Sequence, residues 1–276
     1  MHISRGNQYM VLSSLFFSLI GLCVKLTSHI SNLEVNFFKS VIALAVSYSL
    51  LARDKVNIVG NNRRLLLARG IAGGLGIVLF FVTLQYLPLA TATTIQNTSP
   101  IFTTILGIFI VKEPVSLRRW LFFAISFLGV ALANGFDAQA SPYYLCIGLM
   151  SALCMGLANN FTGKMGAKEH PLVIFCYSTL VTAIITGLYL FYDFTMPQPR
   201  DWLILLSMGL LSYAAHYLAI RAYQLAPVAN VSAISYLGIP FALVLDFVLL
   251  GKHFPVMSLL GMGLVLLGVL LSLFYK

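Results

Sequence analysis

Ten continuous apolar runs, each about 20 residues long, constrain this chain more than any other feature. An α-helix of that length spans the hydrocarbon core of a bilayer and satisfies its backbone polar groups internally. Continuous runs also differ from the alternating strands, roughly ten residues long, of a membrane β-barrel. The sequence therefore predicts an all-α membrane protein with ten transmembrane helices, at residues 8–28, 33–52, 66–86, 90–111, 119–135, 143–163, 171–192, 202–224, 229–250 and 256–275.

The composition agrees with a chain whose solvent is the membrane. Of its 276 residues, 59% are hydrophobic and 9% are charged, whereas a soluble domain carries about 25% charged residues. The connections between ten spans are too short for a soluble catalytic domain. The cysteines lack metal-binding spacing, and the glycine-rich run at 70–77 lacks the context of a phosphate-binding loop. We therefore expect no metal, no cofactor and no enzymatic activity.

The positive net charge of +9 is explained by orientation in the membrane. Lys and Arg collect in the cytoplasmic loops of membrane proteins. With the N-terminus inside, 13 of the 17 Lys and Arg residues fall on the inner side, while Lys25, Arg200 and Lys252 fall outside. We therefore expect a multi-pass protein of the cell (inner) membrane with both termini in the cytoplasm. The basic residues form no continuous face, so we expect no nucleic-acid partner.

The two halves of the sequence resemble each other. Pro100 of the first half matches Pro240 of the second, within similar apolar surroundings. We therefore predict two five-helix repeats, at 1–138 and 139–276, within one membrane domain. Because five is an odd number, the second repeat must insert upside down relative to the first. The prediction is a 5+5 inverted repeat, an arrangement on which alternating access can be built.

Two predicted spans are interrupted by polar residues and a proline. The stretch 91–100 carries seven hydroxyl or amide side chains among ten residues, and 230–240 repeats the design. Polar groups at that depth need protein or a water-filled cavity around them, so paired interruptions point to a transport site. The alternative is hydrogen bonding between helices. The predicted substrate-binding residues are Thr93, Gln96, Asn97, Asn159, Tyr213, Ser235, Tyr236 and Phe81.

Two ionisable residues inside the spans are candidates for carrying a proton. Asp246 lies among apolar residues late in the ninth span, and His216 lies deep in the eighth. Ionisable groups in spans are costly and face the bundle interior, and histidine titrates near neutral pH. The alternatives are that Asp246 lies near the outer interface, paired with Lys252 or solvated, and that His216 is a neutral side chain bonded to a neighbouring carbonyl.

Three further charged residues are expected to have structural or gating roles. Lys39 is expected to reach the outer interface or to pair with Glu34; its other possible role is to attract a carboxylate inside a cavity. Arg69 and Glu113 both lie near the inner edge, where an ion pair between them would be structural or gating. We expect neither of these two residues to contact substrate.

Several motifs resemble those of the drug/metabolite transporter superfamily, EamA-like group, over essentially the whole chain. In the segment 33–40, Lys39 stands where the group usually has Arg, and at 251–255 His253 stands where Glu is usual. The surroundings of Glu34, Arg69 and 112–120 are most similar to the S-adenosylmethionine-uptake-like branch. The other segments that carry the resemblance are the turn at 84–94 and the motifs at 65–70, 97–102 and 111–114.

The resemblance implies a secondary active transporter that moves a small organic metabolite, such as an amino acid or an S-adenosylmethionine-type solute, by alternating access. Without a nucleotide-hydrolysis motif, the energy would come from an ion gradient, with protons as the expected ion, or from the solute's own gradient. The expected partners are the metabolite, the lipid bilayer and protons, with the chain as a monomer or homodimer. An integral-membrane enzyme and a channel remain as alternative functions.

Overall fold

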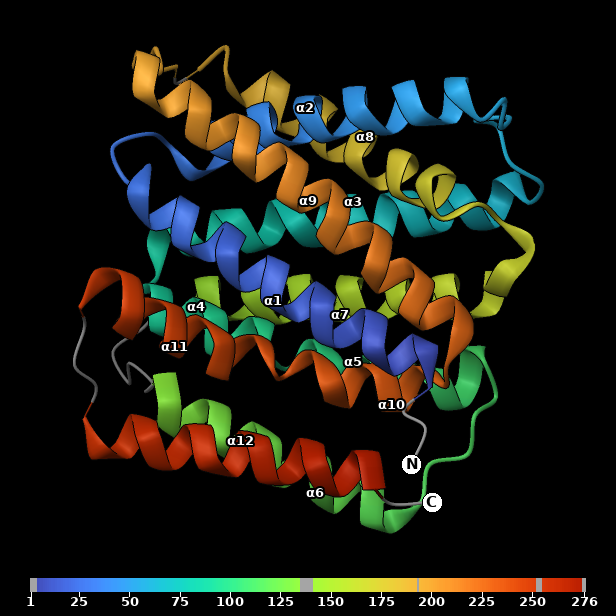
Figure 1. Ribbon diagram of the computed structural model, residues 1–276, viewed down its shortest axis with the longest axis vertical. Coiled ribbons are helices and arrows are strands. Elements are labelled where there is room, and N and C mark those ends of the chain that lie inside the picture. Colours follow the sequence, from blue (N-terminus) through green and yellow to red (C-terminus); the bar gives the residue numbers. More distant parts are fainter. Residues whose placement is uncertain (1–3, 135–140, 193, 252–254, 275–276) are drawn as a thin grey trace.

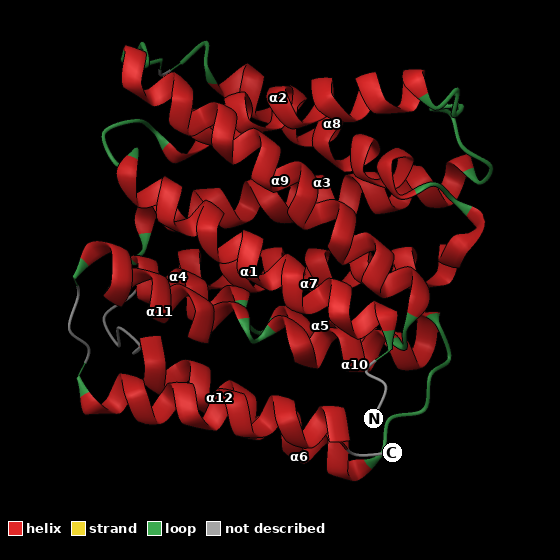
Figure 2. Ribbon diagram, in the orientation of Figure 1, coloured by secondary structure: helices red, strands yellow, loops and turns green. Residues whose placement is uncertain are grey.

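The computed structural model describes residues 4–134, 141–192, 194–251 and 255–274. All regular structure in these residues is helical (Figure 2). The helices are α1 (Arg5–Leu26), α2 (Asn32–Arg53), α3 (Arg63–Tyr86), α4 (Leu89–Gln96), α5 (Ser99–Ile110), α6 (Leu117–Asn134), α7 (Pro142–Met165), a 3-10 turn η1 (Gly166–Lys168), α8 (Pro171–Tyr189), α9 (Pro199–Leu225), α10 (Val228–Ser235), α11 (Gly238–Leu250) and α12 (Val256–Phe274).

These helices confirm the ten predicted spans. The pairs α4–α5 and α10–α11 each form one span, broken where the sequence is interrupted by polar residues. Among the described residues, seven helical segments are long and apolar enough to cross a membrane, and α10–α11 is one of them. The other three spans are α4–α5, α6 and α12. Many large apolar side chains are exposed on the surface, such as Phe109 and Leu203, as lipid contact requires.

The two ends of the bundle differ in what they contain. Helix α1 begins and α12 ends at the same end, which we call the termini end (Figure 1). The connections from α1 to α2 and from α3 to α4 lie at the opposite end, which we call the vestibule end. Placing the start of α1 and the end of α12 together requires an even number of crossings, as ten spans provide. The cytoplasmic location of the termini stays a prediction.

The main helix contacts join the two halves of the chain. Helix α1 packs on α9 and α7 packs on α3, so the first span of each half lies against the third span of the other. Helix α2 packs on α8, α5 on α10, and α6 on α12, so each of these spans lies against the equivalent span of the other half. The interior of the bundle is therefore an interface between the halves, and a rearrangement of one half against the other would change it directly.

Glycines allow the closest of these helix contacts. A Cβ added to Gly70 of α3 would lie 3.0–3.2 Å from Tyr177 of α8, including its backbone. A Cβ added to Gly261 of α12 would lie 2.5 Å from backbone atoms of Gly129 and Ala133 on α6. Small residues at such points let helix backbones approach in a membrane, where lipid gives little hydrophobic drive for association.

Polar side chains add hydrogen bonds to the backbone at both breaks. Pro100 has no N–H to bond the carbonyl of Gln96, so the chain leaves helical geometry there. The side chains of Asn97 and Thr98 donate to the carbonyls of Thr93 and Ile95, each at 2.7 Å, and the same carbonyls also accept the backbone N–H groups of these two residues. The second break repeats this solution, because the Ser235 hydroxyl donates to the carbonyl of Ser232 at 2.7 Å.

Candidate functional site

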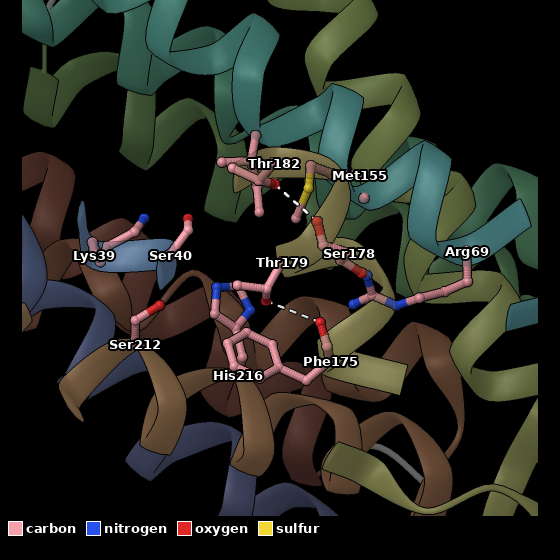
Figure 3. Close-up of a pocket in the computed structure, with 12 residues that line it drawn as sticks. Lys39, Ser40, Arg69, Met155, Phe175, Ser178, Thr179, Thr182, Ser212 and His216 are labelled. Atoms are coloured by element: carbon pink, nitrogen blue, oxygen red, sulfur yellow. Dashed lines mark hydrogen bonds between the residues drawn. The ribbon is translucent and has the colours of Figure 1, made fainter. Parts of the chain in front are cut away.

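A small polar cavity lies between α2, α3, α7, α8 and α9, where the two halves of the chain meet. Its volume is about 20 Å³, close to the space that one water molecule needs. Lys39 lies about two turns into α2 from the vestibule end, and Arg69 about two turns into α3 from the termini end. The cavity therefore lies in the middle of the bundle. It is lined by Lys39, Ser40, Arg69, Gly73, Ile77, Met155, Phe175, Ser178, Thr179, Thr182, Ser212 and His216 (Figure 3).

Arg69 is held at the cavity by two hydroxyl groups. Its Nε donates to the Thr162 hydroxyl of α7 at 3.2 Å, and its Nη1 donates to the Ser178 hydroxyl of α8. Its guanidinium lies directly against Gly73, one turn further along α3, where an added Cβ would collide with it. Arg69 is only 6% exposed, so it is a buried cation at the boundary between the halves rather than a surface charge.

Lys39 approaches the cavity from α2 and is 7% exposed. Its ammonium lies 5.0 Å from the centroid of the Phe81 ring, a cation–π contact. No carboxylate among the described residues lies within ion-pair distance of it. Glu34, its predicted partner, accepts a hydrogen bond from the Thr195 amide at 3.0 Å.

His216 lines the cavity between two aromatic rings. The imidazole stacks on Phe175 of α8 at 5.0 Å between centroids and meets Phe17 of α1 edge-on at 4.9 Å. Lys39 and Arg69 line the same cavity from α2 and α3. The structure therefore brings together three ionisable residues from three helices. The sequence predicted a structural or gating role for Lys39 and Arg69 and a proton-carrying role for His216.

Hydroxyl groups complete the lining. Those of Thr179 and Thr182 donate to carbonyls of their own helix, at 2.9 and 3.0 Å. Ser40 and Ser212 are buried, and neither hydroxyl has a hydrogen-bond partner among the described residues. Sequence reasoning missed these five hydroxyl residues, Ser178 included. The signal for α8 was present, because Ser178, Thr182 and Thr186 recur on one helical face.

The predicted substrate residues on the broken spans lie outside this lining. Gln96 accepts from the Ser151 hydroxyl of α7 at 2.8 Å, and the Asn97 amide is bonded to its own helix. Asn159 donates to the Thr103 hydroxyl at 3.3 Å. In this conformation these polar groups therefore hold α4 and α5 to α7, while Thr93 provides the carbonyl that binds Asn97.

The remaining predicted residues also have distinct surroundings. Tyr236 is fully buried in an apolar cluster beside Phe123, and its hydroxyl has no partner among the described residues. Tyr213 lies one turn before His216 and stacks on Tyr217 at 6.2 Å. Phe81 borders the cavity lining, because the ammonium of Lys39 lies 5.0 Å from the centroid of its ring.

A larger hollow of about 530 Å³, which we call the vestibule, opens at the vestibule end. Lys25 and His29, which line it, are each bonded to a carboxylate. Lys25 Nζ lies 2.5 Å from Asp246 Oδ2, and His29 Nε2 lies 2.9 Å from Asp201 Oδ2. Asp246 is therefore paired with Lys25 of α1, whereas the expected partner Lys252 lies outside the described residues.

Glu113 does not form the expected pair with Arg69. Its carboxylate, between α5 and α6, accepts from the Val228 amide at 2.9 Å, at the start of α10. Burial is the main influence on this carboxyl and raises the pKa of Glu113, although the backbone hydrogen bonds oppose the shift. Glu113 thus ties the first half to the broken span of the second, at the termini end.

Known proteins resemble this chain along most of its length. The pseudopaline exporter CntI of Pseudomonas aeruginosa is 26% identical over 242 residues, which cover 87% of this chain and 85% of that protein. The S-adenosylmethionine uptake transporter of Rickettsia prowazekii is 21% identical over 253 residues, with coverage of 91% and 85%. Mouse solute carrier family 35 member G1 is 26% identical over 259 residues, covering 87% and 70%.

One crystal structure shares the fold, with a TM-score of 0.86 over 98% of both chains at 16% identity. The EamA-like transporter family matches residues 4–135 and again residues 142–274. Together these matches cover nearly the whole chain, and they belong to a family of transporters rather than enzymes. The chain is therefore a multi-pass membrane protein of the EamA-like transporter family, in the drug/metabolite transporter superfamily, and it moves a small metabolite.

Proposed function

We propose that this protein is a secondary active transporter that carries a small organic metabolite by alternating access, with protons as the coupling ion. The proposed solutes are amino acids or S-adenosylmethionine-type compounds. The observation that carries the proposal is the cavity between the halves, with Lys39, Arg69 and His216 in its lining. Charged residues buried in membrane spans mark substrate or ion pathways.

The small size of the cavity supports transport by alternating access. A volume of about 20 Å³ is too small for an amino acid, so this conformation is closed around the site. Loading requires the halves to separate at one end. Because each main helix pair joins one half to the other, a rocking motion would open one end as it closes the other.

The ion pair between Lys25 and Asp246 is the proposed contact at the vestibule end, because it joins α1 of the first half to α11 of the second. Glu113 and the start of α10 form the corresponding contact at the termini end. The polar groups of the broken spans, including Gln96 and Asn97, are proposed to exchange their present internal bonds for solute contacts as these ends open.

His216 is the proposed proton carrier. A proton on its imidazole would add a third positive charge to a lining that already holds Lys39 and Arg69. That charge is tolerated best when an anion enters with it, so solute and proton would bind together. Asp246 is a weaker candidate, because its carboxylate is bonded to Lys25.

Uptake into proteoliposomes tests the proposal. The purified protein would be exposed to a panel of labelled metabolites, including methionine and S-adenosylmethionine, with and without an inward proton gradient. We expect saturable uptake of at least one solute that the gradient accelerates. Non-saturable flux that ignores the gradient for every solute would contradict the proposal. Counter-transport, in which unlabelled internal solute accelerates uptake, distinguishes a carrier from a channel.

A further inference from the structure

The cavity contains two buried cations and, among the described residues, no carboxylate. The chain has eight Asp and Glu residues, of which Asp137 and Asp193 lie outside the described residues. The other six are placed elsewhere: Glu34 accepts from the Thr195 amide, Glu113 from the Val228 amide, and Glu169 from the Asn61 and Asn62 amides; Asp201 and Asp246 pair with His29 and Lys25; and Asp54 is exposed.

Both cations have hydrogen-bond donors that find no partner among the described residues. A guanidinium has five N–H donors, and Arg69 uses two of them on Thr162 and Ser178. The ammonium of Lys39 has three donors, and within the described part of the chain it lies over the face of the Phe81 ring with no hydrogen-bond acceptor bound to it. Figure 3 shows the two side chains on opposite sides of the cavity, with His216 between them. A cation desolvated without an anion is costly, so this arrangement favours an anion supplied from outside.

We propose that the cavity, once opened, binds the carboxylate of the transported solute between Lys39 and Arg69. This inference rests on the proposed function and names the chemical group that the site recognises. The planar fork of Arg69 matches a carboxylate in two parallel hydrogen bonds, and Lys39 adds a point charge. The hydroxyls of Ser40 and Ser212, which lack partners among the described residues, supply further donors.

The same lining sets an order of preference among solutes. An ammonium or sulfonium group in the solute would be repelled by Lys39 and Arg69, and no carboxylate among the described lining residues offsets this repulsion. A solute whose charges are all carboxylates therefore binds best. A zwitterionic amino acid comes next, and a solute with a net positive charge comes last.

Thermal unfolding of the purified protein tests the site without requiring transport. The probes are glutarate, its diamide glutaramide, methionine, methioninamide and inorganic phosphate. We expect glutarate to raise the Tm most and methionine less, because a ligand that binds the folded state stabilises it. The two amides are expected to leave the Tm unchanged. Equal shifts from an acid and its amide, or a shift with phosphate but not with either acid, would overturn the carboxylate assignment.

Two variants connect the effect to the cavity. Lys39→Met and Arg69→Gln are expected to abolish the shift caused by glutarate. The matched controls are Lys164→Met on α7 and Arg64→Gln on α3, both exposed, and these should keep the full shift. Arg69→Lys retains the charge but loses the fork, so we expect a reduced shift. A full shift in Lys39→Met or in Arg69→Gln would refute the proposal.

The ligand-free Tm separates binding from structure. Lys39 pairs with no carboxylate among the described residues, so Lys39→Met breaks no ion pair there. The ligand-free variant should therefore melt at the wild-type temperature or above it. Thr162 and Ser178 keep their bonds to the carbonyls of Ala158 and Ile174 when Arg69 is replaced. A lower ligand-free Tm for both variants would assign the two cations to structure and overturn the inference. If wild-type protein binds glutarate but transports nothing, the proposed function fails while the binding site stands.

Discussion

The vestibule and the central cavity each contain basic residues, but they differ in how those residues are paired. In the vestibule, Lys25 and His29 each lie beside an aspartate. In the cavity, Lys39 and Arg69 have no carboxylate among the described residues. A paired charge already has its partner within the protein and can hold two helices together. An unpaired buried charge is favourable only when an anion arrives from outside. This difference underlies our proposal that the vestibule residues hold the halves in contact, whereas the cavity residues recognise the solute.

Adding a carboxylate to the cavity should pair its cations as those of the vestibule are paired, and we expect this change to have the largest effect on uptake. In Ser178→Asp the new carboxylate would lie beside Arg69, whose Nη1 now donates to the Ser178 hydroxyl. We expect uptake of a carboxylate solute to fall about 100-fold or more, because a charged hydrogen-bonding group is worth about 1.5–3 kcal/mol and a like charge now repels the solute. Initial uptake rates in proteoliposomes measure this effect. Ser178→Asn is the matched control, and an equal loss in both variants would point to disturbed packing.

Replacement of His216 tests the proton in the cavity. His216→Gln retains a polar side chain of similar size but cannot carry a charge near neutral pH. We expect gradient-driven uptake to fall about tenfold, to the level reached without a gradient, because the variant cannot bind the coupling proton. A tenfold loss corresponds to about 1.4 kcal/mol. Uptake measured across a series of external pH values, with and without a proton gradient, tests this. Normal acceleration by the gradient in the variant would remove His216 from the mechanism.

A smaller change displaces Arg69 without altering any charge. Gly73→Ala places a Cβ against the guanidinium, which must shift. We expect the KM for a carboxylate solute to rise about fivefold to tenfold, the loss of roughly one hydrogen bond of about 1 kcal/mol. Alanine in place of glycine favours the helix, so the Tm should not fall. Gly21→Ala on α1, where a Cβ would meet no atom within 4 Å, is the control.

Breaking the pair in the vestibule should have the smallest effect. Asp246→Asn removes the partner of Lys25, and both side chains are partly exposed, at 11% and 26%. Once unpaired, Lys25 still reaches water in the vestibule that it lines, so we expect a loss of about 1 kcal/mol and a change in uptake of up to about fivefold, with its pH dependence intact. The exchanged pair Lys25→Asp with Asp246→Lys should restore the rate. Altered pH dependence in Asp246→Asn would return this residue to the list of proton carriers.

Local patterns explain why the fold could be predicted so fully. The ten spans follow from runs of apolar residues, and the breaks at Pro100 and Pro240 follow from prolines that cannot complete a helical hydrogen bond. Both signals depend on residues close together in the chain. The family motifs repeat the same information in each half, and the two matches to the EamA-like family confirm the resemblance.

The site was harder to predict because it depends on contacts between distant residues. Sequence reasoning placed substrate contacts on the broken spans, but in this conformation Gln96 and Asn97 are bonded within the protein. It favoured the membrane edges for both Lys39 and Arg69, and kept a cavity role for Lys39 only as the alternative. A single long side chain near a helix end gives no sign of whether it reaches lipid headgroups or another helix.

The sequence by itself determined the membrane as solvent, the ten helices, the two breaks and the family. Hydrophobic runs and proline act over a few residues, so no tertiary contact was needed to read them. Only the tertiary structure decided which polar faces meet. The packing of α2 and α3 against α8 and α9 rotates Lys39, Arg69 and His216 toward one cavity, and it places Asp246 beside Lys25 instead. Helix rotation is set by packing between elements distant in sequence, which the local pattern does not contain.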